Sequence, residues 1–104
     1  MSAVAFAALA EPTRRRILDL LRERARPVNE LVELLGISQP GVSKHLRVLR
    51  EAELVHVRRD AQRRWYELRP ERLSEVDAWL APYRELWAGR LDELERHLDL
   101  KERR

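Results

Sequence analysis

The side chains of this chain with the most evident chemistry are Gln39, Ser43, Lys44 and Arg47, which carry an amide, a hydroxyl and two cations. Their spacing places Lys44 and Arg47 on one side of a helix, with Gln39 and Ser43 on its flank. Packing gives little reason for such a surface near the N-terminal end of a helix. Amides, hydroxyls and cations are the groups that read base edges and hold phosphates in a DNA major groove. The pattern therefore predicts a DNA recognition helix.

The segment from residue 38 to residue 54 has the signals of such a helix. Ser38 suits the N-cap position, and Pro40 follows in the first turn, where a missing N–H costs nothing. Val42, Leu46 and Leu49 recur at i, i+4 and i+7, which is one apolar face. We expect this face to pack inward and the polar side to remain free.

The segment before it has the form of the first helix of a helix-turn-helix. Residues 28–35 carry apolar side chains at five of eight positions, and Gly36 follows where a helix end needs a left-handed residue. Ile37 is an apolar residue inside the turn. Two helices joined by a short turn with glycine match the supersecondary signature. An ordinary helical hairpin with a solvated polar face would show the same apolar pattern.

Residues 55–68 change to a period of two and predict a β-hairpin. Val55 and Val57 alternate with polar residues, and the alternation resumes after a polar tip. The expected tip, residues 58–64, holds four arginines. Directly after a helix-turn-helix we interpret this hairpin as a wing that follows the DNA backbone or enters the minor groove, although a plain charged loop is the alternative. We expect Trp65 and Tyr66 to anchor the wing to the body.

Two helices are expected before the helix-turn-helix. Residues 4–9 form a short apolar helix, and Pro12 opens a second one. That second helix has a buried stripe of Ile17, Leu18, Leu20 and Leu21, with Arg14, Arg15 and Arg16 on its outer side. It ends before Pro27, since proline disfavours helix at the preceding residue.

The last element, residues 73–100, is expected to be a long helix with a broad apolar stripe, bent or broken near Pro82. A chain this small has limited core for so many large side chains, so the stripe indicates a partner surface. The simplest partner is a second copy of the chain, because symmetric dimers are the commonest oligomers. The alternative is that this helix folds back over its own core. The expected dimer interface consists of Val4, Phe6, Leu9, Trp79, Tyr83, Leu86, Trp87, Leu91, Leu94 and Leu98.

Length, composition and charge limit the classes of protein to which the chain can belong. The 104 residues, 44% hydrophobic and 38% charged, suit one globular domain over 1–104, with 70–104 mainly a dimerisation helix. Residues 38–73 hold nine Lys and Arg against five Asp and Glu, a net +4, whereas residues 74–104 hold six against eight, a net −2. The positive charge thus lies on the proposed reading unit.

The sequence has no cysteine, which excludes disulfides, thiolate metal sites and a cysteine nucleophile. The apolar segment 3–10 is short and its basic cluster follows it, so it does not resemble a signal peptide. No run approaches the length of a membrane span. We therefore expect a cytoplasmic protein without membrane contact, metal or cofactor. The three histidines fall on different elements and no catalytic constellation is evident, so we do not expect an enzyme.

The chain resembles the ArsR-type (SmtB-type) winged-helix transcriptional repressors. The resemblance covers nearly all of it. It is carried by residues 8–21 (ALAEPTRRRILDLL), residues 30–55 (ELVELLGISQPGVSKHLRVLREAELV) and the hairpin ending in Trp65-Tyr66-Glu67-Leu68. The run Ser-Gln-Pro-x-Val-Ser-x-His-Leu-x-x-Leu is specific in this context. The fold implied is mainly α with a small β-hairpin, a winged helix-turn-helix that dimerises through its N- and C-terminal helices. The function implied is a homodimer that sits on a palindromic operator in double-stranded DNA and blocks transcription, with an effector able to lower its affinity.

The resemblance also implies the residues that contact DNA. From the recognition helix these are Ser38, Gln39, Pro40, Gly41, Ser43, Lys44, His45 and Arg47. From the wing they are Arg58, Arg59, Arg63 and Arg64. His45 lies beside the apolar face, so it either reaches back to a phosphate or packs. We favour the phosphate contact.

The sequence departs from the family's metal-sensing pattern. Many relatives hold metal through a Cys-x-Cys pair at the helix before the recognition helix, and the corresponding positions here are Pro27 and Asn29, with Val32 where a further cysteine can sit. A second family site uses Asp and His pairs on the last helix, where this chain has the single histidine His97. Protein sites for zinc and nickel use two or more imidazole or thiolate ligands. The aromatic residues of the last helix are also typical of relatives without a metal site.

The expected function is therefore a metal-independent repressor. Two alternatives remain: a metal-responsive repressor that uses His97 with Asp77, Asp92, Glu93 or Glu95, and a winged-helix protein-interaction module that has lost DNA binding. The sequence leaves the operator, the regulated genes and any effector open.

Overall fold

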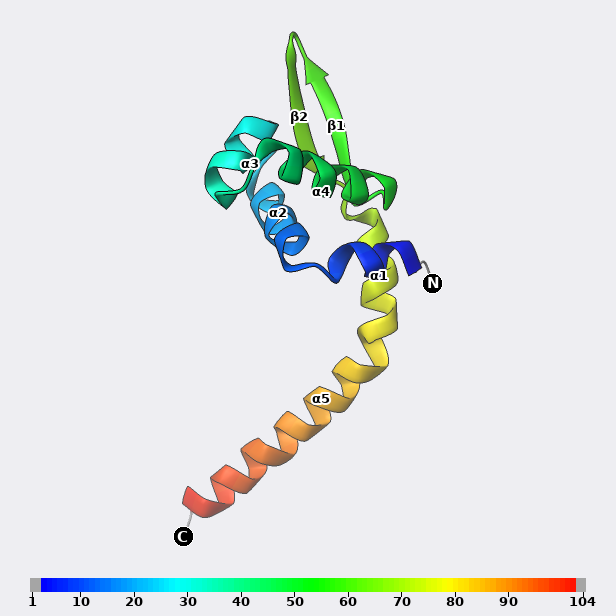
Figure 1. The fold of residues 1–104 in the computed structure, drawn as a ribbon. Helices are drawn as coiled ribbons and strands as arrows, with labels where there is room; N and C mark the ends of the chain where they lie inside the picture. The colour runs from blue at the N-terminus through cyan, green and yellow to red at the C-terminus, as the bar shows by residue number, and fades with distance from the viewer. Residues whose placement is uncertain (1–2, 103–104) are drawn as a thin grey trace.

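The computed structural model describes residues 3–102, which form six helical segments and one β-hairpin (Figure 1). In chain order these are α1 (Ala3–Leu9), α2 (Pro12–Glu23), α3 (Val28–Leu35), α4 (Gln39–Glu51), β1 (Val55–Asp60), β2 (Arg63–Leu68), the 3₁₀ turn η1 (Pro70–Arg72) and α5 (Leu73–Glu102). The hairpin and α5 project from opposite ends of the molecule. The architecture is that of a winged helix-turn-helix, as expected.

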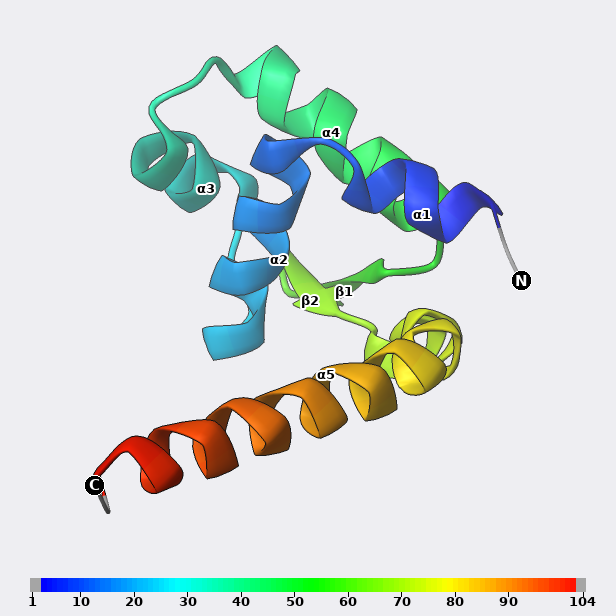
Figure 2. The same ribbon diagram turned by 90° about the horizontal axis from the view of Figure 1, so that it is seen from below.

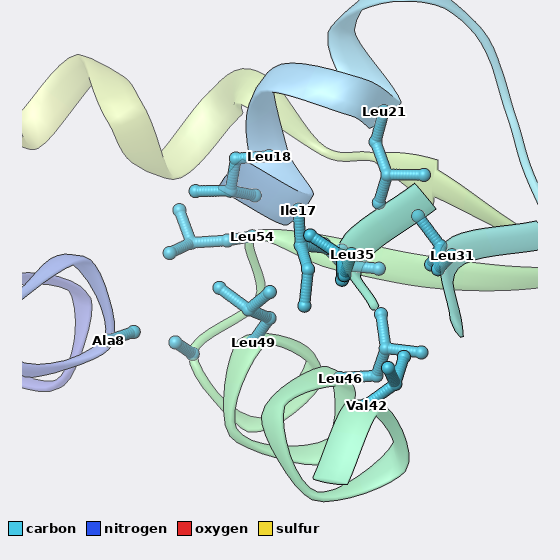
Figure 3. Close-up of a cluster of buried hydrophobic side chains, with 12 residues drawn as sticks. Ala8, Ile17, Leu18, Leu21, Leu31, Leu35, Val42, Leu46, Leu49 and Leu54 are labelled. Atoms are coloured by element: carbon cyan, nitrogen blue, oxygen red, sulfur yellow. The ribbon is translucent and has the colours of Figure 1, made fainter. Parts of the chain in front are cut away.

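The core lies where α2, α3 and α4 meet the base of the hairpin (Figure 3). Each helix contributes most of the apolar residues that its sequence indicated, although Leu34 of α3 is exposed. The buried side chains include Ile17, Leu18 and Leu21 of α2, Leu31 and Leu35 of α3, Val42, Leu46 and Leu49 of α4, and Leu54 and Val55 beyond it. Leu20 is only partly buried at the edge. The three helices therefore hold one another at fixed angles, and α4 lies with its polar side outward.

The ends of α2, α3 and α4 are set by local chemistry. The Glu11 carboxylate accepts the backbone N–H of Arg14 (2.9 Å), and the Ser38 hydroxyl accepts that of Gly41 (3.2 Å). These bonds satisfy N–H groups that the first turn of a helix leaves free. Gly36 ends α3 with φ +68°, the left-handed conformation expected of it.

The end of α4 uses a left-handed residue that is not glycine. Glu53 has φ +59°, its N–H bonds to the Arg50 carbonyl, and the N–H of Leu54 bonds back to the Leu49 carbonyl (2.9 Å each). This is the Schellman pattern of a helix end. It turns the chain sharply, so that Leu54 enters the core and β1 starts directly after α4.

A buried arginine anchors the base of the hairpin. Arg26 and Tyr66 exchange two backbone hydrogen bonds (3.0 and 2.9 Å), while the Arg26 guanidinium bonds to the Leu20 carbonyl (3.1 Å). The same guanidinium pairs with Glu23 (2.7 Å) and Glu30 (2.5 Å). A buried charge needs such compensation. The wing is thereby tied to the segment between α2 and α3.

The hairpin is tighter than its sequence predicted. β1 and β2 pair antiparallel in the register Val55↔Leu68 to Asp60↔Arg63, which leaves only Ala61 and Gln62 as the connection. The arginines expected in a loop therefore lie on paired strands. Tyr66 packs against the core as expected, whereas Trp65 stands beneath the guanidinium groups of Arg58 and Arg63, 6.0 and 5.9 Å from its ring centroid.

Helix α5 is one continuous element with Pro82 inside it. Figures 1 and 2 show its axis bending where the colour passes from yellow to orange. Proline removes one hydrogen bond and crowds the preceding turn, which bends a helix without necessarily ending it. The bend is as expected, and the helix is not broken.

The first half of α5 packs beside α1, and the second half leaves the body. Phe6 and Trp79 meet edge to face with their ring centroids 5.8 Å apart, and Trp79 lies 4.9 Å from Tyr83. Beyond the bend, α5 runs away from the core (Figure 1), which makes the molecule 67 Å long. The distal half is thus not folded over its own core. Within residues 3–102 no helix is both long and apolar enough to cross a membrane.

Candidate nucleic-acid interface

The polar side of α4 faces outward from the core. Because Val42, Leu46 and Leu49 are buried, Gln39, Ser43, Lys44 and Arg47 are exposed. Across residues 3–102, no hydrogen bond or ion pair within the chain engages these four side chains. The helix therefore presents an amide, a hydroxyl and two cations that are available to an external ligand.

The first turn of α4 is shaped by its cap. Ser38 commits its hydroxyl oxygen to the Gly41 N–H, so its role within the chain is to start the helix. A Cβ added at Gly41 would lie 3.2 Å from that hydroxyl oxygen, so a larger residue would press on the cap. Pro40 and Gln39 are exposed beside it.

His45 occupies a different position from the other predicted contacts. Its side chain is 22% exposed, and its Nδ1 lies 3.4 Å from Nη1 of Arg14 and 4.0 Å from the Glu11 carboxylate. The imidazole is therefore engaged on the inner flank of α4, toward the start of α2. Its contact with a phosphate stays a prediction.

The predicted wing arginines differ in their partners. The guanidinium of Arg58 bonds to Glu67 (2.5 Å) and lies 3.8 Å from Asp60. Hydrogen bonds from Arg58 and His56 lower the pKa of Glu67, and the Glu67 carboxylate raises the pKa of Arg58. Much of the charge of Arg58 is thus neutralised within the hairpin.

Arg59 and Arg64 face each other directly across the hairpin. Like charges in opposed positions destabilise a strand pair. Among the described residues, no acidic side chain pairs with Arg59, Arg63 or Arg64. The guanidinium group of Arg63 lies over the ring of Trp65. The outer part of the wing thus concentrates uncompensated positive charge, which an external polyanion would relieve.

A hollow of about 360 Å³ lies between α3, α4 and the wing. No carboxylate of residues 3–102 lines it. Its lining consists of Pro27, Val28, Asn29, Gln39, Ser43, Arg63, Arg64 and Tyr66. The fold therefore brings the base-reading and wing residues predicted from distant parts of the sequence around one basic surface.

A second hollow of about 540 Å³ adds arginines that sequence reasoning missed. It lies between the C-terminal half of α4 and the base of the wing, where Arg50 and Arg69 join Arg47 and the carboxylate of Glu51 also lines the hollow. Arg50 follows Arg47 by one helical turn, a spacing that could have signalled a continuing cationic edge. Arg69 lies beyond the alternating segment and had no comparable signal.

The residues at the family's metal positions do not fit a transition metal. Pro27 and Val32 offer no donor side chain and Asn29 offers only an amide, whereas zinc prefers thiolates and imidazoles. In residues 3–102 no three His, Cys, Asp or Glu side chains are grouped to hold a metal ion.

The expected dimer-interface residues are largely uncovered. Val4, Trp79, Tyr83, Leu86, Trp87, Leu91, Leu94 and Leu98 are 44–64% exposed, while Phe6 and Leu9 are partly buried within the chain. Leu34 and Leu100 are also exposed apolar residues and were not predicted. A long apolar surface thus lies on α5, away from the basic side.

Comparison with known proteins decides the family. The family model described as "Bacterial regulatory protein, arsR family" matches residues 11–57. The transcriptional repressor SdpR of Bacillus subtilis is 36% identical over 75 residues, which cover 72% of this chain and 83% of SdpR. The chain belongs to the ArsR family.

Further relatives and solved structures agree with this assignment. The regulator KmtR of Mycobacterium tuberculosis is 42% identical over 71 residues, which cover 68% of this chain and 55% of KmtR. A crystal structure of an ArsR family transcriptional regulator matches with a TM-score of 0.70 and 32% identity, over 82% of this chain and 88% of that one.

A solution structure of a similar protein connects this fold with DNA binding. A homodimeric winged helix-turn-helix DNA-binding domain from Mycobacterium bovis matches with a TM-score of 0.65 and 29% identity, over 80% of this chain and 77% of that one. This ArsR-family protein is a DNA-binding transcriptional regulator with a winged helix-turn-helix fold.

Proposed function

We propose that this ArsR-family protein is a homodimeric repressor that binds a palindromic operator and whose DNA affinity does not depend on metal. The observation that carries the proposal is the set of unpaired polar and cationic side chains that α4 and the outer wing bring to one surface. Gln39 and Ser43 read base edges, while Lys44, Arg47, Arg59, Arg63 and Arg64 hold phosphates.

The dimer follows from the apolar surface of α1 and α5. Trp87, Leu91 and Leu94 are more than half exposed, and burying them against a second copy would remove that apolar area from water. In this arrangement residues 1–104 act as one domain, and residues 70–104 serve mainly dimerisation. The related M. bovis domain is homodimeric, which supports the same assembly here.

Two copies read two half-sites. Each α4 enters one major groove, and the grooves are separated by one DNA turn, roughly 34 Å. The wings hold the flanking backbone, and repression follows because the bound dimer covers the promoter. The protein acts in the cytoplasm, where the DNA is, and as a regulator rather than an enzyme.

Independence from metal follows from the donor set. The first family site lacks thiolates, and His97 is exposed on α5 without a second imidazole. The metal-responsive alternative would need His97 and nearby carboxylates to hold the ion.

Fluorescence anisotropy tests the proposal directly. Purified protein is titrated against duplex DNA from upstream of its own gene and against a scrambled duplex, over a salt series, with and without zinc. We expect tight binding that prefers the native duplex, weakens steeply with salt because released phosphates regain counterions, and ignores zinc. Equal weak binding to both duplexes would support the protein-interaction alternative or a distant operator. A loss of affinity with zinc would support the metal-responsive alternative.

Gln39→Ala tests the assignment of base reading. We expect this variant to reduce discrimination among operator variants, because a bidentate amide contributes about 1–3 kcal/mol against a wrong base. Arg63→Ala is the matched control and should weaken binding to all sequences alike. If Gln39→Ala left the relative affinities for operator variants unchanged, Gln39 would not read the operator.

A further inference from the structure

One side chain joins the end of α1 to the middle of the recognition helix. Arg14, in the first turn of α2, donates from Nε to the Ala8 carbonyl (2.7 Å) and from Nη2 to the Ala7 carbonyl (3.1 Å). Its third nitrogen, Nη1, lies 3.4 Å from Nδ1 of His45 in α4. Carbonyls at a helix end lack intrahelical partners. Arg14 satisfies that of Ala8 and adds a second donor to that of Ala7, which also accepts the Ala10 N–H (3.3 Å), while contacting α4.

A hydrogen bond from Arg14 to His45 requires one particular tautomer of the imidazole. Arginine has no acceptor, so its contact requires Nδ1 to accept and the ring proton to lie on Nε2. The Glu11 carboxylate, 4.0 Å from Nδ1, also accepts the Arg14 backbone N–H. Arg14 and Glu11 are the charged groups that face the imidazole. Together they hold a partly buried ring in one orientation.

Because of the position of His45, its contact with Arg14 can influence the orientation of the DNA-facing surface. His45 follows Lys44 directly and lies two residues before Arg47, both on the outward side. Apolar packing of Val42, Leu46 and Leu49 is non-directional, and it tolerates small rotations of α4 better than a hydrogen bond does. A polar contact on the inner flank restricts the rotation that would displace Lys44 and Arg47.

We propose that Arg14 is a positioning residue for DNA binding, which links α1 to α4 through Nδ1 of His45. His45 then serves as an internal anchor of the recognition helix and not as a phosphate ligand. Since α1 is expected at the dimer interface, the same link makes the orientation of α4 depend on how α1 is held. This inference rests on the DNA binding proposed above.

Asparagine and glutamine at position 45 distinguish the two roles. The Asn amide places its polar atoms near the Nδ1 position of histidine, whereas the Gln amide extends to the Nε2 position. We expect His45→Asn to keep affinity for the upstream duplex within about twofold, and His45→Gln and His45→Ala to lose about tenfold, as for one hydrogen bond to a charged group. Retention by His45→Gln with loss by His45→Asn would overturn the proposal, because it would show that His45 acts outward through Nε2.

Arg15 supplies the matched control for Arg14. Arg15 also bonds to a carbonyl at the end of α1, that of Leu9 (2.8 Å), but it does not reach α4. We expect Arg14→Gln to lose about tenfold in affinity with an unchanged salt slope, and Arg15→Gln to lose less than about twofold. Equal losses would mean that Arg14 only caps α1. A salt slope lower by about 0.9 in Arg14→Gln would mean that Arg14 itself contacts a phosphate. Either result overturns the proposal.

A measurement without DNA separates this inference from the proposed function. Nitrogen NMR of the histidine rings reports which nitrogen carries the proton. In the wild type we expect the neutral His45 ring to carry its proton on Nε2. In Arg14→Gln we expect His45 to shift toward a mixture of the two tautomers. A proton on Nδ1 in the wild type would overturn the link even if the operator were correct. Failure of the wild type to bind any duplex would instead count against the proposed function.

Discussion

At the scale of single residues, partners decide which arginines of the wing are available to DNA. Arg58 and Arg64 are both exposed and both lie on the hairpin. Arg58 is bonded to Glu67 and lies near Asp60, whereas Arg64 faces another arginine, Arg59. A cation already paired with a carboxylate gains less from a phosphate than an unpaired one.

Arg64→Ala and Arg58→Ala should therefore differ. We expect Arg64→Ala to weaken DNA binding about tenfold and to lower the salt slope by about 0.9, as for one lost phosphate contact. Arg58→Ala should cost less than about twofold. Anisotropy over a salt series measures both variants. Equal losses would show that the Glu67 pair opens when DNA binds.

The buried Arg26 makes Glu30 a second informative residue. Burial alone would raise the pKa of Glu30, but hydrogen bonds from Arg24 and Arg26 outweigh it and lower the pKa below its ordinary value. A carboxylate with a lowered pKa contributes stability that is fully present above its unfolded pKa and is lost as pH falls through its folded pKa.

Glu30→Gln tests this dependence. We expect the wild-type Tm to fall as pH drops below about 4.3, the ordinary range of a glutamate. The variant should have a lower Tm at pH 7 and a smaller decrease on acidification. Thermal unfolding followed by circular dichroism from pH 7 to pH 3 measures both. Parallel curves for the two proteins would exclude Glu30 as a source of acid sensitivity.

At the scale of elements, the hairpin is short and carries local strain. Ala61, the first residue of its two-residue connection, has φ +56°, a region that residues with a Cβ seldom adopt. Glycine is favoured at such positions in two-residue hairpins. The opposed Arg59 and Arg64 add repulsion nearby. The wing is thus held by its base at Arg26 and Tyr66 more than by its tip.

Ala61→Gly should relieve the strain at the tip. The left-handed conformation costs a residue such as alanine about 1–2 kcal/mol, and glycine loses about 0.5–1 kcal/mol in chain entropy, so we expect a net gain of about 0.5–1 kcal/mol. Chemical denaturation measures the free energy of unfolding. Gln62→Gly is the matched control, because Gln62 has no positive φ and should only lose stability.

At the scale of the whole molecule, the basic and apolar surfaces are separated. The wing and α4 lie at one end, and the distal half of α5 extends from the other (Figure 1). The exposed apolar side chains of α5 continue from Trp79 to Leu100 over a molecule 67 Å long. This separation lets a second copy cover α5 while both recognition helices stay free.

Leu91→Glu with Leu94→Glu tests the expected assembly. Both leucines are more than half exposed, so the substitutions should not disturb the folding of the core. We expect the double variant to sediment as a monomer and to lose operator affinity at least tenfold, because a single half-site supplies fewer phosphate and base contacts. Asp92→Ala with Glu95→Ala, on the same segment, is the control. A double variant that remained dimeric would place the interface elsewhere.

Local patterns predicted most of the fold. The stripe of Val42, Leu46 and Leu49, the cap at Ser38 and the left-handed Gly36 all appear where the sequence indicated them. Alternation in the hairpin also predicted its two strands, which pair with Val57 opposite Tyr66. These features depend on residues within a few positions of each other, so the sequence was sufficient for them.

The tertiary structure alone decided which charges are free. The sequence determined that α4 would present Gln39, Ser43, Lys44 and Arg47, because helical periodicity separates them from the buried face. It did not show that Arg58 is paired by Glu67, that Arg26 is buried, or that His45 meets Arg14. The contact of Arg14 with His45 spans 31 positions, and the bridge between Arg26 and Tyr66 spans 40. They form only when packing of the core brings separate elements together, and no local periodicity records them.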